Sequence, residues 1–219
     1  MVALACAAAV GCGRKGGDGS GARQGEPLRV AAAADLALAF EEVGREFERS
    51  SGKRVDFSFG STGLLAKQIE EGAPFDVFAA ANASFVDDVV RAGACDGATK
   101  HLYARGRIVL WAKDAAALPS DLSGLTEPRF AKVAIANPEH APYGRAAAQA
   151  LTKAGVWPTL QPKVVYGENV RQTLIFAQSG NTEVAVVALS LAIASEGSYL
   201  PVDPSMLDPL DQEMVVCGG

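Results

Sequence analysis

Two hydroxyl residues lie between glycines in one short turn, Gly60-Ser61-Thr62-Gly63, and this turn could bind an anion. It follows an alternating stretch typical of a strand and precedes residues 64–71, where apolar residues recur at helical spacing. The first N–H groups of a helix have no partner within it and carry part of a positive charge, so anions bind there. Alternatively, Ser61 or Thr62 only caps the helix, a role that needs no ligand.

The same arrangement recurs at further strand-to-helix junctions. Asp35, Tyr143 and Val170 each stand near the start of a predicted helix that follows a predicted strand, as Thr62 does. In open α/β sheets ligands bind at this edge of the sheet, so four helix N-termini could converge on one cleft. Six or seven hydrogen bonds to a charged ligand, each worth about 1.5 to 3 kcal/mol, would supply the ~12 kcal/mol of nanomolar binding without Lys or Arg.

Strands and helices alternate from Leu28 onward, which predicts an α/β fold. The predicted strands are residues 28–34, 53–59, 75–81, 107–113, 132–136, 163–166 and 183–189. Helices are predicted after the first three strands and after the strands at 132–136 and 163–166, with Asp35 capping the first helix and Leu36, Phe40, Val43 and Phe47 on its inner face. We expect two lobes, residues 28–106 with 200–219 and residues 107–199, each a mostly parallel sheet flanked by helices with the ligand cleft between them.

Composition limits the classes of function. The chain has 219 residues, 49% hydrophobic and 21% charged, which indicates a globular protein long enough for two small lobes. A net charge of -5 argues against a nucleic-acid or anionic-membrane partner. His101 and His140 have no Cys or His at metal-ligand spacing, so we expect them to be surface or structural histidines and expect no site where side chains bind a metal ion.

The first 26 residues differ in composition from the rest. Val2 to Val10 is apolar but too short to span a bilayer, and Ala9-Val10-Gly11-Cys12 resembles a lipobox. We interpret residues 1–26 as an export signal and tether, with Cys12 carrying the lipid; an Ala-rich helix with a chance cysteine is the alternative. The basic start of a signal peptide is missing, so the true start is expected upstream. Cys95 and Cys217 could form a disulfide, which the sequence alone does not decide.

Several segments together carry a resemblance to a known family. They are Val30 to Leu36, Ser58 to Gly63, Gln68 to Phe78 with its Gly72-Ala73-Pro74-Phe75-Asp76 stretch, Asn137 to Gly144, Gly167 to Val170, and Val187 to Ser190. In this order they resemble the periplasmic molybdate-binding proteins of ABC importers. The resemblance covers Leu28 to the C-terminus and implies a two-lobed type II solute-binding fold. It also implies that hydroxyls and N–H groups hold the oxygens of the molybdate oxyanion at the positions of Asp35, Thr62, Tyr143 and Val170, with Ala188 and Ser61 as further positions.

The chain departs from this pattern at two site positions and at its end. Asp35 stands where the family usually has Ser or Asn, and Ala188 where some members have Tyr; Tyr143 would supply the phenolic hydroxyl instead. The resemblance also implies a final helix beyond Val216, so we expect a truncated or frameshifted end and an exposed apolar groove on the first lobe. For Asp35 a helix cap is the favoured role, and two others stay open: a protonated donor, or an acceptor of a proton from a ligand such as hydrogen phosphate.

Other classes fit the residues less well. A hydrolase would need a Gly-x-Ser-x-Gly elbow or a paired nucleophile and base, and a nucleotide enzyme would need a P-loop or a Gly-x-Gly-x-x-Gly turn. We therefore predict a periplasmic or cell-surface receptor, not an enzyme and without a cofactor. It is expected to be a monomer, attached to the membrane only by lipid, that passes molybdate or tungstate to an ABC permease. A receptor for phosphate, sulfate or another oxyanion is the alternative.

Overall fold

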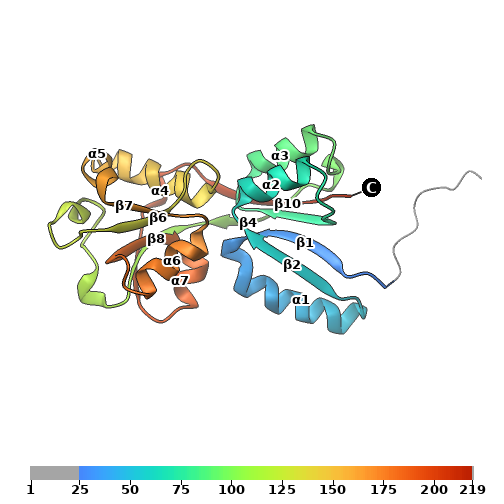
Figure 1. Ribbon diagram of the computed structural model, residues 1–219, viewed down its shortest axis with the longest axis horizontal. Coiled ribbons are helices and arrows are strands. Elements are labelled where there is room, and N and C mark those ends of the chain that lie inside the picture. The colour runs from blue at the N-terminus through green and yellow to red at the C-terminus, as the bar shows by residue number, and fades with distance from the viewer. Residues whose placement is uncertain (1–24, 219) are drawn as a thin grey trace, which may run out of the picture.

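The computed structural model describes residues 25–218, which form two lobes side by side, each built on a five-stranded sheet (Figure 1). Helices cover both faces of each sheet. This confirms the predicted two-lobed α/β fold. The predicted export segment with Cys12 lies outside the described residues, apart from Gly25 and Glu26.

The first lobe contains the strand order β2-β1-β3-β10-β4. Its strands are β1 (Leu28–Ala33), β2 (Val55–Gly60), β3 (Val77–Ala80), β4 (His101–Gly106) and β10 (Leu210–Val216). Its helices are α1 (Ala37–Ser51), α2 (Thr62–Glu70) and α3 (Ala83–Arg91), and a 3-10 turn, Ala34–Leu36, joins β1 to α1.

The second lobe contains the strand order β7-β6-β8-β5-β9. Its strands are β5 (Ile108–Ala112), β6 (Val133–Ala136), β7 (Val164–Gly167), β8 (Val184–Ala188) and β9 (Ser198–Pro201). Its helices are α4 (Pro142–Lys153), α5 (Trp157–Leu160), α6 (Val170–Gln178) and α7 (Leu189–Ile193). Strands β5, β6 and β8 are buried along their whole length, as in a sheet covered on both faces.

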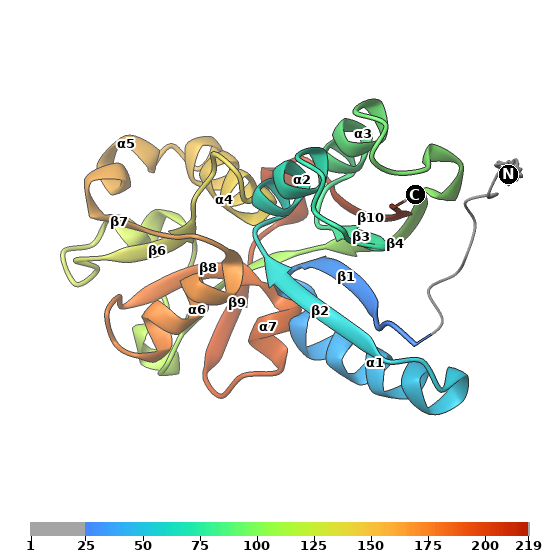
Figure 2. The ribbon, with the colours of Figure 1, turned by 45° about the vertical axis from the view of Figure 1, so that its right-hand side comes forward.

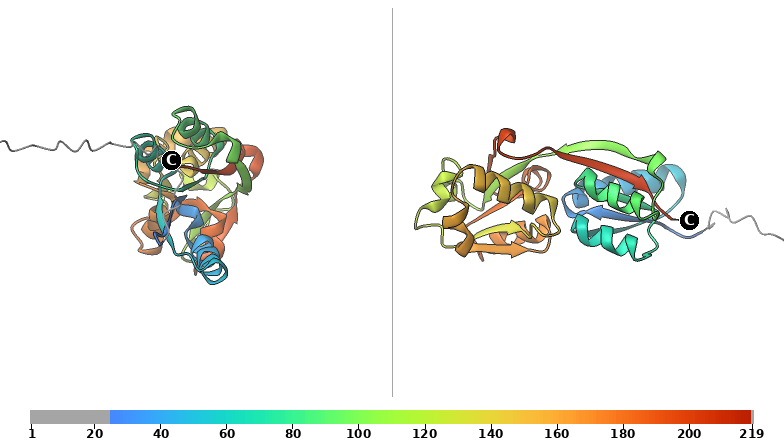
Figure 3. Two further views of the ribbon diagram at one scale, coloured as in Figure 1. Left: turned by 90° about the vertical axis from the view of Figure 1, so that its right-hand side faces the viewer. Right: turned by 90° about the horizontal axis from the view of Figure 1, so that it is seen from above.

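The chain crosses between the lobes twice, from β4 to β5 and from β9 to β10, and both crossings run along one side of the molecule (Figure 3, right). Because of these crossings both sheets are mixed, not mostly parallel as predicted: β10 runs antiparallel to β3 and β4, and β5 antiparallel to β8 and β9. Strand β9 pairs with β5 in the second sheet, so the predicted division before residue 200 cuts through β9.

Local sequence explains where these elements begin and end. Strand β1 is lined with alanines, and Ala31 and Ala32 are fully buried between β2 and β3. Asn82 caps α3 by accepting a hydrogen bond from the Ser84 N–H, and Gly52 ends α1 with a φ of 68°.

The predicted inner face of α1 is only partly correct. Phe40 packs toward the sheet, but Val43 is 59% exposed and Phe47 is 39% exposed. The helix instead approaches the sheet through Gly44, where an added Cβ would lie 2.5 Å from the Phe57 ring. Helix α1 and strand β2 lie together at one margin of the molecule, which leaves part of the helix uncovered (Figure 2).

Cys95 and Cys217 form a disulfide that ties the segment after α3 to the end of β10, across 122 residues of sequence. The two residues also form an isolated antiparallel bridge. Within residues 25–218 no helix is long and apolar enough to cross a bilayer.

Replacing both cysteines with serine is expected to destabilise the protein. A disulfide that closes about 122 residues restricts the unfolded chain by about 5 kcal/mol in the chain-entropy model. The free energies of unfolding in urea of the unchanged protein (the parent) and of the double variant should therefore differ by several kcal/mol. Reduction of the disulfide in the parent should abolish this difference. Equal unfolding midpoints for the oxidised parent and the variant would contradict the prediction.

Candidate anion-binding site

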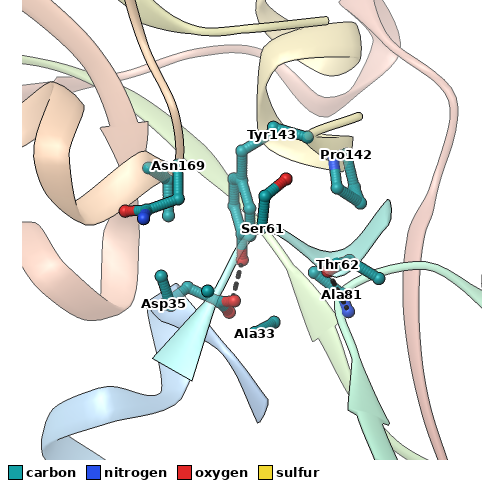
Figure 4. Close-up of a pocket in the computed structure, with 12 residues that line it drawn as sticks. Ala33, Asp35, Ser61, Thr62, Ala81, Pro142, Tyr143 and Asn169 are labelled. Carbon is teal, nitrogen blue, oxygen red and sulfur yellow. Dashed lines mark hydrogen bonds between the residues drawn. The ribbon is translucent and has the colours of Figure 1, made fainter. Parts of the chain in front are cut away.

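A small pocket lies between the lobes where strand-to-helix junctions meet (Figure 4). The β1, β2 and β3 ends of the first lobe and the starts of α4 and α6 in the second line it: Ala33, Ala34, Asp35, Gly60, Ser61, Thr62, Ala81, Ala141, Pro142, Tyr143, Asn169 and Val170. Its volume is about 10 Å³, which is room for about one water molecule, whereas pockets for organic ligands are usually about 300 to 1,000 Å³. In this arrangement the site therefore excludes an organic ligand.

Backbone N–H groups at three helix starts are available to a ligand. In α2 the Gly63 N–H is taken by the His140 carbonyl, at 2.9 Å, which leaves that of Thr62. In α4 the first residue is Pro142, which has no N–H, and Tyr143 follows it. In α6 the Asn169 side chain caps the second and third N–H groups, which leaves that of Val170. No hydrogen bond found within residues 25–218 uses the N–H of Thr62, Tyr143 or Val170.

The Thr62 hydroxyl adds a fourth donor. Thr62 is 1% exposed, and its Oγ1 accepts a hydrogen bond from the Ala81 N–H at 3.2 Å. Since the oxygen is used as an acceptor, the hydroxyl proton remains free to donate. The structure thus places Thr62, Tyr143 and Val170, three of the predicted ligand positions, around one pocket.

Asp35 does not cap its helix, which corrects the favoured prediction. It lies within the 3-10 turn, and α1 begins two residues later without a side-chain cap. Its Oδ2 instead accepts a hydrogen bond from the Tyr143 hydroxyl of the second lobe at 3.0 Å (Figure 4). The same oxygen accepts a hydrogen bond from the amide of Gln212, on β10 of the first lobe, at 2.7 Å. The same Gln212 amide donates to the Tyr143 oxygen at 3.1 Å.

Burial controls the protonation of this cluster. Asp35 is 3% exposed, and desolvation raises its pKa, while the hydrogen bonds from Gln212 and Tyr143 and the contact with its own backbone N–H act in the opposite direction. Desolvation also raises the pKa of Tyr143 well above its usual value, and the nearby Asp35 carboxyl raises it further. Tyr143 therefore stays protonated and able to donate.

The Ser61 side chain contacts His140 of the second lobe. Its Oγ lies 2.9 Å from the His140 carbonyl oxygen and 2.8 Å from His140 Nδ1. A hydroxyl has one proton, and a carbonyl can only accept, so Oγ donates to the carbonyl and accepts from Nδ1–H. Ser61 has no proton left for a ligand here, and His140, predicted as a surface or structural histidine, joins the lobes.

The places of Ala188 and Gln212 relative to the pocket were the hardest to predict from the sequence. Ala188 is fully buried at the end of β8 and is not among the residues that line the pocket. Gln212 was missed, because β10 was not predicted as a strand. The sequence signal for this strand is that Leu210, Gln212 and Met214 stand at every second position, as residues on one face of a strand do.

Comparison with known proteins identifies the family. A family model described as bacterial extracellular solute-binding protein matches residues 28–219. The chain belongs to this family. It is 37% identical over 188 residues to the molybdate-binding protein ModA of Rhodobacter capsulatus, covering 85% of this chain and 74% of that protein. The putative ABC transporter substrate-binding lipoprotein YvgL of Bacillus subtilis is 30% identical, with 77% and 65% covered.

Solved structures agree with this assignment. The periplasmic molybdate-binding protein of Azotobacter vinelandii superposes with a TM-score of 0.81 at 29% identity, covering 87% of this chain and 85% of that chain. The sulfate-binding protein SubI of Mycobacterium tuberculosis, at 16% identity and a TM-score of 0.73, shares the fold. Family membership also confirms that the chain is a solute-binding protein and not an enzyme.

Gly63→Ala is expected to push the lobes apart. A Cβ at Gly63 would lie 2.7 Å from the His140 carbonyl oxygen and 3.0 Å from the Phe85 ring. Such overpacking costs about 1 to 3 kcal/mol, comparable with a few interlobe hydrogen bonds. Small-angle X-ray scattering should show a larger radius of gyration for the variant than for the parent.

Gly60→Ala is the matched control in the same turn. Its Cβ would meet the Leu65 side chain no closer than 3.4 Å, which is ordinary contact. The prediction fails if Gly63→Ala scatters like both the parent and this control.

Proposed function

We propose that this protein is the extracytoplasmic substrate-binding component of an ABC importer and binds molybdate as a tetrahedral dianion between its lobes. The observation that carries the proposal is that Thr62, Tyr143 and Val170 meet at one pocket too small for an organic ligand, while their helix-start N–H groups have no hydrogen-bond partner within residues 25–218. The Thr62 hydroxyl adds a further donor there. Relatives named as molybdate-binding proteins support the choice of anion.

The strength of binding is adequate without a formal positive charge. No Lys or Arg is among the residues that line the pocket. Four donors to a charged ligand, at about 1.5 to 3 kcal/mol each, contribute about 6 to 12 kcal/mol, which spans the micromolar to nanomolar range. The macrodipoles of α2, α4 and α6 add to this attraction at their N-terminal ends.

Several finer points belong to the proposal. Thr62, Tyr143 and Val170 bind the ligand oxygens through their N–H groups. Asp35 contacts the ligand from the first lobe. Ser61 donates to the ligand only if its hydroxyl gives up its hydrogen bond to His140. Ala188 supports the wall behind the pocket. Cys12 carries a lipid anchor, as the name of the Bacillus relative indicates for that protein. The protein acts as a monomer that delivers molybdate, and tungstate of similar size and charge, to the permease.

Asp35 is the residue that an oxyanion receptor has to accommodate. A carboxylate about 4 Å from a dianion would cost about 8 kcal/mol at an effective dielectric constant near 20, which is most of the binding energy available. The alternative function, a receptor for a protonated anion such as hydrogen phosphate, would use the ionised carboxylate as an acceptor. The observation that keeps this alternative open is that the buried Asp35 Oδ1 has no hydrogen-bond partner within residues 25–218 and could accept a proton from a ligand.

A panel of oxyanions tests the proposed function. Molybdate and tungstate should raise the melting temperature of the purified protein, because a ligand at about 1,000 times its dissociation constant adds ~4 kcal/mol of stability. Sulfate, phosphate and chromate should give smaller shifts. A shift with phosphate alone would replace molybdate by the alternative, and no shift with any of these anions would refute oxyanion binding.

Thr62→Ala should weaken molybdate binding by about 10- to 150-fold, since it removes one hydrogen bond to a charged ligand worth about 1.5 to 3 kcal/mol. Thr62→Ser is the matched control, because it keeps the hydroxyl that pairs with the Ala81 N–H. Isothermal titration calorimetry measures both affinities. If Thr62→Ala loses stability but binds as tightly as the parent, the hydroxyl serves the fold alone.

A further inference from the structure

Among the described residues that line the pocket, Asp35 is the only one with a carboxyl group, and its two oxygens are in different situations. Oδ2 accepts two hydrogen bonds, from Tyr143 and Gln212. Oδ1 is buried and has no hydrogen-bond partner within residues 25–218. A buried carboxyl oxygen without a partner is unfavourable unless a ligand supplies one.

The direction of these hydrogen bonds decides where a proton on Asp35 would lie. Tyr143 has one hydroxyl proton and donates it to Oδ2, while the Gln212 amide donates to Oδ2 and to the Tyr143 oxygen. Both acceptor directions of Oδ2 are therefore used. A proton on the carboxyl group belongs on Oδ1.

Within residues 25–218, no positively charged group is found beside the Asp35 carboxyl group to stabilise its ionised form. The groups that face it are the Tyr143 hydroxyl on α4, the Gln212 amide on β10 and the Tyr103 phenol on β4, whose hydroxyl donates to the Ala80 carbonyl at 3.0 Å. From α7 the Ser190 hydroxyl reaches only the Asp35 backbone carbonyl. The titratable His140 is engaged with Ser61, at the other side of the pocket.

We propose that Asp35 enters the anion complex as a neutral acid and donates its proton from Oδ1 to an oxygen of the bound oxyanion. This inference rests on the proposed function. At any pH where Asp35 of the free protein is ionised, the protein takes up one proton from solvent together with each dianion. No covalent bond of the anion changes, and the complex gains one hydrogen bond in place of the repulsion between two negative groups.

Two consequences distinguish this arrangement from a neutral donor such as Asn or Ser. Burial raises the pKa of Asp35, so the proton needed is held more strongly than by an exposed carboxyl. Above that pKa, binding requires proton uptake, and the affinity for molybdate falls by about tenfold for each unit of pH. The acid also favours a fully deprotonated dianion, which presents only acceptors, over an anion that carries its own proton.

Infrared difference spectroscopy and calorimetry on the full chain test the proposal with molybdate. The molybdate complex of the parent should show the absorption of a protonated carboxyl group, and Asp35→Asn should lack it. In calorimetry between about pH 6 and 9, where an ordinary Asp stays ionised, two buffers of different ionisation enthalpy report the protons taken up. The parent should take up one proton per molybdate at the alkaline end, and Asp35→Asn none.

Two controls separate Asp35 from other titratable groups. His140→Gln removes the nearby histidine and should keep both the infrared band and the proton uptake of the parent, even if its affinity is lower. Asp211→Asn removes a carboxylate that pairs with Arg105 outside the pocket, and should match the parent in every measurement.

Three results would overturn the proposal. The first is that the parent binds molybdate tightly, but its complex shows no infrared band of a protonated carboxyl group that disappears in Asp35→Asn. The second is a parent that binds phosphate, and not molybdate, and loses it in Asp35→Asn, which would make Asp35 an ionised acceptor. The third is no oxyanion binding by the parent or any variant, which would refute the proposed function itself and not only the protonation of Asp35.

Discussion

An anion buried away from water must find hydrogen-bond donors to replace its hydration shell, and this constraint explains the arrangement of the pocket. The chain provides donors from backbone N–H groups at helix starts, which are fixed by the fold and need no side-chain ordering. Each strand of the pocket must end at the same edge of its sheet, and each following helix must begin there. The parallel pairs β1 with β2 and β6 with β7 supply that alignment.

The features repeated along the chain were the predictable ones. Strand-to-helix junctions follow from local periodicity and turn residues, so the positions of Thr62, Tyr143 and Val170 at helix starts could be read from the sequence. The α/β order also predicted that ligands bind at the sheet edge where these junctions lie, so that the helix starts could converge on one cleft. The two-lobed fold could be predicted for the same reason, because each half repeats the same succession of strand and helix.

The parts that depend on distant pairing could not be predicted. Gln212 is 177 residues from Asp35, and it reaches Asp35 only because β10 crosses back into the first sheet beside β3. The local preference of Asp for helix caps suggested a different role, but a 3-10 turn moves the start of α1 to Ala37, and the Asp35 side chain is then free to turn into the pocket. Strands β4 and β9 have weak alternation of their own and are defined mainly by their partners.

In the proposed anion complex the donors are divided between the lobes, and this division offers a way to release a tightly held anion. Thr62 and Asp35 belong to the first lobe, and Tyr143 and Val170 to the second. Opening the lobes therefore removes about half of the donors at once. Losing two hydrogen bonds worth about 1.5 to 3 kcal/mol each lowers affinity by roughly 10²- to 10⁴-fold. Opening would also break the Tyr143 contact with Asp35 and the His140 contacts with Ser61 and Gly63, so closure and binding would stabilise each other.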